Sequence, residues 1–128
     1  MFKKFRRFRN NRRRGLVAVE VAMVAPFVFI LVFGLMEWAR AEMIRQATST
    51  AAFNAARLGT VPGTTTTEVE DKAAAFLDVY FVSNATIVAT ITEDESTISV
   101  SVPMADNSWF LKQFFGNLTI HRDFTLRR

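Results

Sequence analysis

The sequence predicts an α+β fold in which a long N-terminal helix packs on a small antiparallel sheet with one short helix. Three observations support this prediction. Residues 16–36 form an apolar run of helical length, and residues 37–58 continue it with helix-forming residues and no proline or glycine. Residues 86–102 hold two segments in which apolar and polar side chains alternate. We therefore divide the chain of 128 residues into a basic start (1–15), a long helix (16–59) and a small α+β domain (60–128).

Positive charge is concentrated at the start of the chain. Eight of the first fourteen residues are Lys or Arg, whereas the remainder carries eight basic and twelve acidic residues. Because this charge lies on a short tail beside an apolar run, it indicates a topology signal rather than a nucleic-acid surface. A basic flank stays in the cytoplasm, so residues from about Glu37 onward are expected outside it. The chain has no cysteine, which excludes a disulfide framework and a thiolate metal site.

The run from Leu16 to Met36 is long enough, at about 1.5 Å per residue, to cross the hydrocarbon core of a bilayer. Its one charged residue is Glu20, which either lies near the interface or finds a positive partner when subunits assemble. Trp38 fits an interfacial anchor. A signal peptide cleaved after Ala39-x-Ala41 is an alternative, but charged residues and an aromatic crowd that site.

Beyond the apolar run, the helix is expected to extend to Leu58, with Gly59 as its C-cap and Pro62-Gly63 as a stop. One face of this part is rich in alanine, which suits close packing against a sheet or another helix. The alanines are Ala47, Ala51, Ala52, Ala55 and Ala56.

A short amphipathic helix is predicted after the threonine-rich linker. Thr67 and Glu70 have the spacing of a capping box, and the helix is expected to end near residues 82–84. Two strands follow at 86–92 and 97–102, joined as a hairpin by residues 93–96.

A third strand is predicted to run from about Leu118 to Leu126, with Arg122 interrupting its apolar face. Before it, residues 108–115 are aromatic-rich and are expected to form a helical turn that covers the sheet. Trp109, Phe110, Phe114 and Phe115 are the aromatic residues of this segment, and a contact surface for other chains is the alternative to core packing.

Other residue patterns favour ordinary structural roles. His121 is the one histidine and lies beside charged residues on an alternating segment, so we expect a surface residue rather than a catalytic base. Residues 93–95 are acidic but lack the spacing of a calcium loop, which favours a solvated hairpin tip. Phe2, Phe5 and Phe8 among basic residues are compatible with anionic lipid. No cofactor or metal site is predicted, and nothing indicates an enzyme.

The run RGLVAVEVA at residues 14–22 resembles the processing site of type IV prepilins. In that class a dedicated peptidase cuts after the glycine on the cytoplasmic face, and the new terminal amine is commonly methylated. The cut here would fall between Gly15 and Leu16, which makes residues 1–15 a prepilin leader. Glu20 would stand five residues past the cut, where the resemblance implies that it pairs with the terminal amine of Leu16 on a neighbouring subunit.

Residues 13–58 resemble one branch more closely, the TadE-like minor pilins (pseudopilins) of the tight-adherence, or Flp (type IVc), pilus system. The resemblance includes Pro26, the motif Gly34-Leu35-Met36-Glu37 and the alanine-rich stretch that ends at Arg57. The chain departs from this branch at Val21, where phenylalanine is frequent. Major Flp pilins are far shorter, which favours a minor component.

The resemblance implies a structural, non-enzymatic protein of the bacterial inner membrane with a single pass, its N-terminus cytoplasmic and its C-terminal domain periplasmic. Its partners would be other pilins and pseudopilins, prepilin peptidase, the Tad secretion machinery and membrane lipid, with no nucleic acid. It could also end in the extracellular pilus. The alternative is an uncleaved, single-pass membrane-anchored periplasmic binding or adhesion module. A membrane-tethered enzyme is the third class, and no catalytic constellation supports it.

Overall fold

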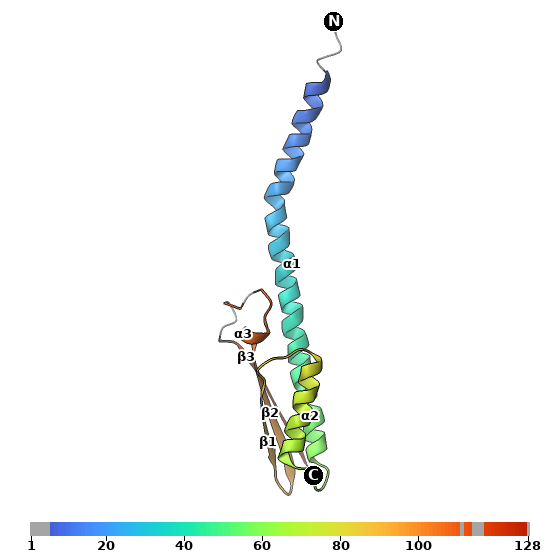
Figure 1. Ribbon diagram of the computed structural model, residues 1–128, viewed down its shortest axis with the longest axis vertical. Coiled ribbons are helices and arrows are strands. Elements are labelled where there is room, and N and C mark those ends of the chain that lie inside the picture. The colour runs from blue at the N-terminus through green and yellow to red at the C-terminus, as the bar shows by residue number, and fades with distance from the viewer. Residues whose placement is uncertain (1–5, 111, 114–116, 128) are drawn as a thin grey trace. The chain divides into compact units, whose positions relative to one another are not determined.

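The computed structural model describes residues 6–110, 112–113 and 117–127. Its elements are shown in Figure 1, and their bounds are α1 (Arg6–Gly59), α2 (Thr66–Val79), β1 (Thr86–Ile91), β2 (Glu95–Pro103), α3 (Met104–Asn107) and β3 (Thr119–Arg127). The chain divides into two units, residues 1–36 and residues 37–128. The α+β class predicted from the sequence is confirmed by the long helix and the three-stranded antiparallel sheet.

Helix α1 begins earlier than predicted and ends where predicted. It starts at Arg6, inside the basic segment, and runs to Gly59. Pro26 lies inside the helix without ending it. Proline removes one backbone hydrogen bond, a loss that long apolar helices tolerate when their surroundings satisfy the freed carbonyl.

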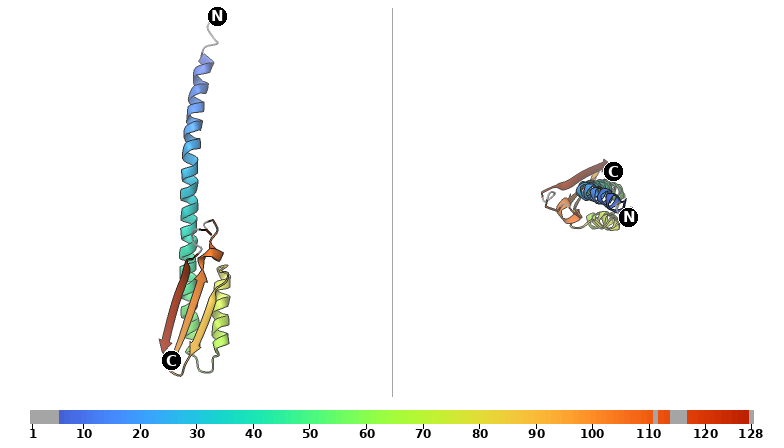
Figure 2. Two further views of the ribbon diagram at one scale, coloured as in Figure 1. Left: turned by 90° about the vertical axis from the view of Figure 1, so that its left-hand side faces the viewer. Right: turned by 90° about the horizontal axis from the view of Figure 1, so that it is seen from above.

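In the second unit, the sheet has strand order β1-β2-β3, and helices α1 and α2 pack on one of its faces (Figure 2). The alanine face of α1 is fully buried there, as predicted, and the side chain of Phe53 meets Phe124 of β3 edge-on at 5.9 Å between ring centroids. Small side chains let the helix backbone approach the sheet closely. The core combines this face with one row of α2 and the inner row of β2; its larger members are Ile44, Val69, Leu77, Ile98, Val100, Val102 and Met104.

The predicted alternation of the strands is confirmed. Along β1, Ile87, Ala89 and Ile91 face the core, and along β3, Ile120 and Phe124 do so while Arg122 is exposed. The pairs of β2 with its two neighbours are antiparallel throughout. The hairpin connection is shorter than predicted, because β1 ends at Ile91 and β2 begins at Glu95.

The start of α2 lies two residues before the predicted one. Thr65 is the N-cap, and it forms the capping box with Glu68 rather than Thr67 with Glu70. Glu70 is used elsewhere, since its carboxylate accepts a hydrogen bond of 3.0 Å from the backbone N–H of Ala89 in β1. The helix also ends at Val79, before the predicted residues 82–84.

The aromatic segment before β3 differs from its prediction. The helical turn is α3 at Met104–Asn107, before the predicted residues 108–115. Trp109 and Phe110 are 57% and 51% exposed, so the expectation of core packing is wrong for these two side chains. Phe114, Phe115, Phe2 and Phe5 lie outside the described residues.

At position 59 a glycine is required because a larger residue would collide with its neighbours, not because of its backbone conformation. An added Cβ would lie 3.0 Å from the Cβ of Ser96, and closer still to its Oγ. Ser96 is buried, and its Oγ has no hydrogen-bond partner among the described residues. The end of α1 is therefore packed directly against the start of strand β2.

We expect Gly59→Ala to lower the free energy of unfolding by about 1–3 kcal/mol, because the new methyl group overpacks this contact. Adding Ser96→Ala to the same chain should recover part of the loss, since it removes the hydroxyl that lies closest and leaves no buried oxygen unpaired. Denaturant unfolding of the full chain in detergent micelles, followed by circular dichroism, measures both effects. A Gly59→Ala chain as stable as the unmodified one would contradict this account of the contact.

Candidate functional site

The residues predicted to carry processing and assembly lie on α1 in the first unit. Leu16 and Glu20 are four residues apart in the helix, so they lie on one face about one turn from each other. Both are exposed, Leu16 by 72%. An added Cβ at Gly15 would meet no atom within 4 Å, so packing inside this unit does not explain the glycine.

The large apolar side chains between residues 16 and 36 are 42–74% exposed in the first unit. Helix α1 is long and apolar enough to cross a membrane. Beside Glu20, an apolar groove is lined by Val21, Val24, Ala25, Val28 and Phe29. A carboxylate in such a surface is costly in lipid unless a positive group neutralises it.

A second carboxylate of α1, that of Glu37, is satisfied inside the second unit. Glu37 is 1% exposed and accepts hydrogen bonds from the Ser108 hydroxyl and from the backbone N–H groups of Trp109 and Phe110, the latter two at 3.2 Å. All three donors come from one segment that follows α3. Glu37 therefore fastens residues 108–110 to the first helical turn of this unit.

One turn further along α1, Arg40 fastens a second segment. Its guanidinium is 5.5 Å from the centroid of the Trp109 ring, and the residue is 6% exposed. Burial lowers the pKa of Arg40, and the charge of Glu37 opposes part of that shift. The guanidinium donates hydrogen bonds to three backbone carbonyl oxygens, those of Tyr80 (2.9 Å), Phe81 (2.8 Å) and Asn107 (3.4 Å).

Asn107 ties the two segments to each other. Its side-chain amide donates to the carbonyl oxygens of Ser83 (2.9 Å) and Pro103 (2.8 Å), and its side-chain oxygen accepts from the backbone N–H of Ser83 at 2.7 Å. We call Glu37, Arg40 and Asn107 the polar hub. Its donors and acceptors are satisfied by the Ser108 hydroxyl and by backbone groups of neighbouring segments, so the hub holds structure rather than a ligand.

This hub was not predicted from the sequence. One signal could have revealed it: Glu37, Arg40, Ile44, Ala47 and Ala51 recur at helical spacing on one face. The buried row of α1 therefore continues backwards from its alanines into two charged residues. Their partners lie 40 to 73 residues away, so the contacts themselves could not be predicted.

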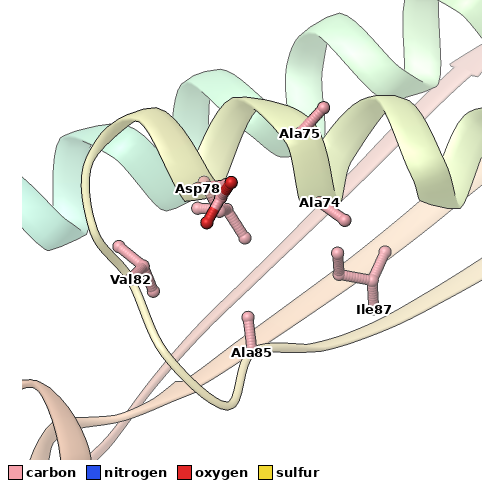
Figure 3. A pocket seen from close by; sticks show the side chains of 7 residues that line it. Ala74, Ala75, Asp78, Val82, Ala85 and Ile87 are labelled. Atoms are coloured by element: carbon pink, nitrogen blue, oxygen red, sulfur yellow. The ribbon is translucent and has the colours of Figure 1, made fainter.

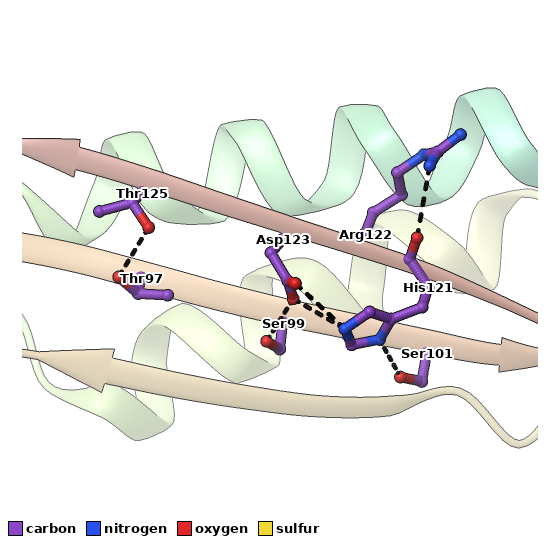
Figure 4. Close-up of polar contacts among 7 residues, drawn as sticks. All are labelled: Thr97, Ser99, Ser101, His121, Arg122, Asp123 and Thr125. Atoms are coloured by element: carbon purple, nitrogen blue, oxygen red, sulfur yellow. Dashed lines mark hydrogen bonds and ion pairs between the residues drawn. The ribbon is translucent and has the colours of Figure 1, made fainter.

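The outer face of the sheet carries a ladder of polar side chains (Figure 4). His121 lies on this surface as predicted, 54% exposed, with its Nδ1 2.6 Å from Ser101 Oγ and its Nε2 3.0 Å from Asp123. The hydroxyl of Ser99 donates to Asp123 at 2.5 Å, and chiefly for this reason the pKa of Asp123 is lowered.

This ladder contains serine, histidine and aspartate in hydrogen-bonded order, which is the composition of a catalytic triad. The arrangement differs from one in its surroundings. Ser101 lies on the central strand β2, whose backbone N–H groups are used in pairing with both neighbours, so they are not free to stabilise an oxyanion. We interpret the ladder as cross-strand pairing on a solvated face, like the neighbouring contact of 2.9 Å between Thr97 and Thr125.

A shallow recess lies between α2 and the start of β1 (Figure 3). Ala74, Ala75, Val82, Ala85 and Ile87 line it together with Leu77 and one acid, Asp78. Such walls offer little to orient a polar ligand. In the part of the chain that the structure describes, no group of three or more His, Asp or Glu side chains is placed to hold a metal ion.

These features define a class: an α+β protein with one N-terminal helix that is long and apolar enough to span a membrane, and with a lone carboxylate near the start of its apolar run. The family model described as TadE-like protein matches residues 15–57. The resemblance predicted for the N-terminal helix is thereby confirmed over this segment, and it is consistent with a TadE-like protein of the Tad (Flp) pilus system. No curated protein and no solved structure matches the chain.

We expect Glu37→Ala to lower the free energy of unfolding by about 3–5 kcal/mol, because it removes the acceptor of three hydrogen bonds and the negative charge beside a buried guanidinium. Glu42→Ala is the matched control on the same helix. The Glu42 side chain is 45% exposed and lies 3.5 Å from Arg45, so its loss should cost less than about 1 kcal/mol. Denaturant unfolding of the two full-length variants measures the difference, and equal effects would show that the hub is not a source of stability.

Proposed function

We propose that this chain is a structural minor pilin (pseudopilin) that takes part in assembly of a Flp/Tad-type pilus through its N-terminal helix. Prepilin peptidase would cut between Gly15 and Leu16, removing the basic leader of residues 1–15. The observation that carries the proposal is the lone Glu20 carboxylate on an exposed apolar helix face, one turn after Leu16, inside the segment that matches the TadE-like model.

The chemistry of assembly follows from charge balance. Cleavage creates a terminal amine at Leu16. In a bundle of apolar helices, both this amine and the Glu20 carboxylate would be buried without water unless they pair with each other. Pairing of Glu20 with the amine of a neighbouring subunit neutralises both charges, and a register error separates them at a cost of several kcal/mol. Since Leu16 and Glu20 lie one turn apart, the amine can pair with the carboxylate of its own chain before assembly.

The remaining parts fit the same role. The basic leader keeps the N-terminus in the cytoplasm, where the peptidase would act, and places residues 37–128 in the periplasm. Partners would be other pilins and pseudopilins, the Tad secretion machinery and membrane lipid. We assign no reaction to the chain, because we interpret the serine, histidine and aspartate on the sheet face as cross-strand pairs on a solvated surface rather than as a catalytic triad.

An uncleaved, membrane-anchored periplasmic binding or adhesion module is the alternative function. It is favoured by the second unit, which has a core and a polar hub of its own. The two functions differ in the state of the N-terminus.

Intact-mass spectrometry of the chain isolated from cells that contain the pilus system should give a terminus at Leu16, with or without a methyl group. The reason is that the glycine lies next to the basic segment and has no packing role in its own unit. A Gly15→Leu variant should keep residues 1–15, since a large side chain would block access to the bond. Recovery of native protein that begins at Met1 would support the anchored module instead.

Glu20→Gln should leave membrane insertion intact and reduce incorporation into pili by more than about tenfold, because breaking a buried ion pair costs about 3–5 kcal/mol. Glu42→Gln is the matched control: the same chemical change on the same helix, at a half-exposed carboxylate of the second unit. Membrane fractionation and quantification of the chain in sheared pili measure the two steps. Normal incorporation of the Glu20→Gln chain would exclude the proposed role of this carboxylate.

A further inference from the structure

Four aromatic side chains of the second unit are exposed beside the polar hub. Their exposed fractions are 68% for Trp38, 83% for Phe81, 57% for Trp109 and 51% for Phe110. We call these four residues the aromatic collar. Leu118 adjoins them, since it lines one groove together with Trp38 and is 50% exposed. Phe81 and Trp109 line a second groove together with Arg40. Rings of this size gain roughly 1.5–3 kcal/mol each when they leave water, so four exposed rings on the segments next to the hub indicate a surface that something covers.

The hub holds the segments of three of these rings in place, and Trp38 lies between Glu37 and Arg40 on α1. Glu37 binds the backbone N–H groups of Trp109 and Phe110, and Arg40 binds the carbonyl oxygen of Phe81. Phe81 has a φ of 53°, a left-handed conformation that a bulky residue rarely adopts. Two buried charged residues therefore hold a strained backbone that leaves an aromatic ring in solvent, an arrangement the core does not require.

The position of the collar along the chain indicates what covers its rings. Trp38 follows the last residue of the apolar run, Met36, by two residues, and Arg40 follows it by four. At about 1.5 Å per residue, the helical levels that hold the collar lie about 3–6 Å beyond the end of the run. The headgroup layer of a bilayer is of similar thickness, about 5–7 Å on each side of the hydrocarbon core.

We propose that the aromatic collar inserts into the headgroup layer of the leaflet on the side of the second unit. It would fix the height of this unit above the hydrocarbon core. Tryptophan favours this layer because its ring is apolar and its N–H remains hydrated. Charges of both signs lie beside the collar: Lys112 and Asp106 on the segments near Trp109, and Glu42, Arg45 and Arg122 in the groove beside Trp38. We therefore assign the attraction to the rings rather than to charge, and zwitterionic lipid is sufficient to test it.

This inference requires that the apolar run span a bilayer, and it does not depend on cleavage at Gly15 or on pilus assembly. It goes beyond the proposed function, because a pilin-type helix needs no aromatic surface on the unit that follows it. The two proposals can therefore fail separately.

Tryptophan fluorescence tests the proposal directly, since the chain has two tryptophans and both belong to the collar. Trp38→Phe and Trp109→Phe each leave one tryptophan in an uncleaved full chain reconstituted in phosphatidylcholine vesicles. Lipids brominated near the glycerol end or near the methyl end of the acyl chain report the depth of that ring. A third chain carries both substitutions together with Val61→Trp, which places the probe on an exposed position past the far end of α1, about 30 Å along the helix from Trp38.

We expect each collar tryptophan to emit at shorter wavelength than the probe at position 61. Each should also be quenched several-fold more strongly by bromine near the glycerol end than near the methyl end, and the probe at position 61 by neither. Circular dichroism of the three chains verifies their folding. Emission of both collar tryptophans like that of the control would overturn the proposal. A second result would also overturn it. If both tryptophans keep their short-wavelength emission at a higher protein-to-lipid ratio while quenching by brominated lipid declines, a second copy of the chain, and not lipid, covers the rings.

Discussion

The second unit depends on two charged side chains that it buries at its first helical turns. Glu37 and Arg40 lie on the same row of α1 as the apolar residues that pack on the sheet, yet they meet loops rather than strands. A buried charge is tolerated when hydrogen bonds replace its water, and here backbone groups of two loops supply them. The arrangement fixes the loops that follow α2 and α3.

The two carboxylates of α1, Glu20 and Glu37, differ in where their partners are found. Glu37 has a full set of donors within its own chain, so its energy contributes to folding of the second unit. Glu20 stands on an exposed apolar surface, and its neutralisation in a membrane or a helix bundle has to come from a positive group close to it. The same residue type on one helix therefore serves stability at one position and, in the proposed function, recognition at the other.

The parts of the fold that depend on local periodicity could be predicted from the sequence. The alanine face of α1 and the alternation in β1 and β3 follow from spacing alone, because burial selects one side of each element. The start of α2 could not be fixed, since Thr65 with Glu68 and Thr67 with Glu70 offer the same capping chemistry, and the bond from Ala89 to Glu70 distinguishes them. The hub could not be predicted for a related reason. Glu37 and Arg40 are stabilised by hydrogen bonds to segments that are distant in the sequence, and a charged residue in a helical pattern does not show which distant groups it will bind.

The surfaces of the chain therefore differ in the medium that suits them. Large apolar side chains surround residues 16–36, aromatic rings gather where the second unit begins, and hydroxyl, imidazole and carboxylate groups occupy the open face of the sheet. Hydrocarbon suits the first surface, a headgroup layer the second and water the third. A helix crossing alone would set which side of the membrane the second unit occupies. The collar, held by Glu37 and Arg40, adds a constraint on its height, because sinking would bury the hub loops in hydrocarbon and rising would return four rings to water.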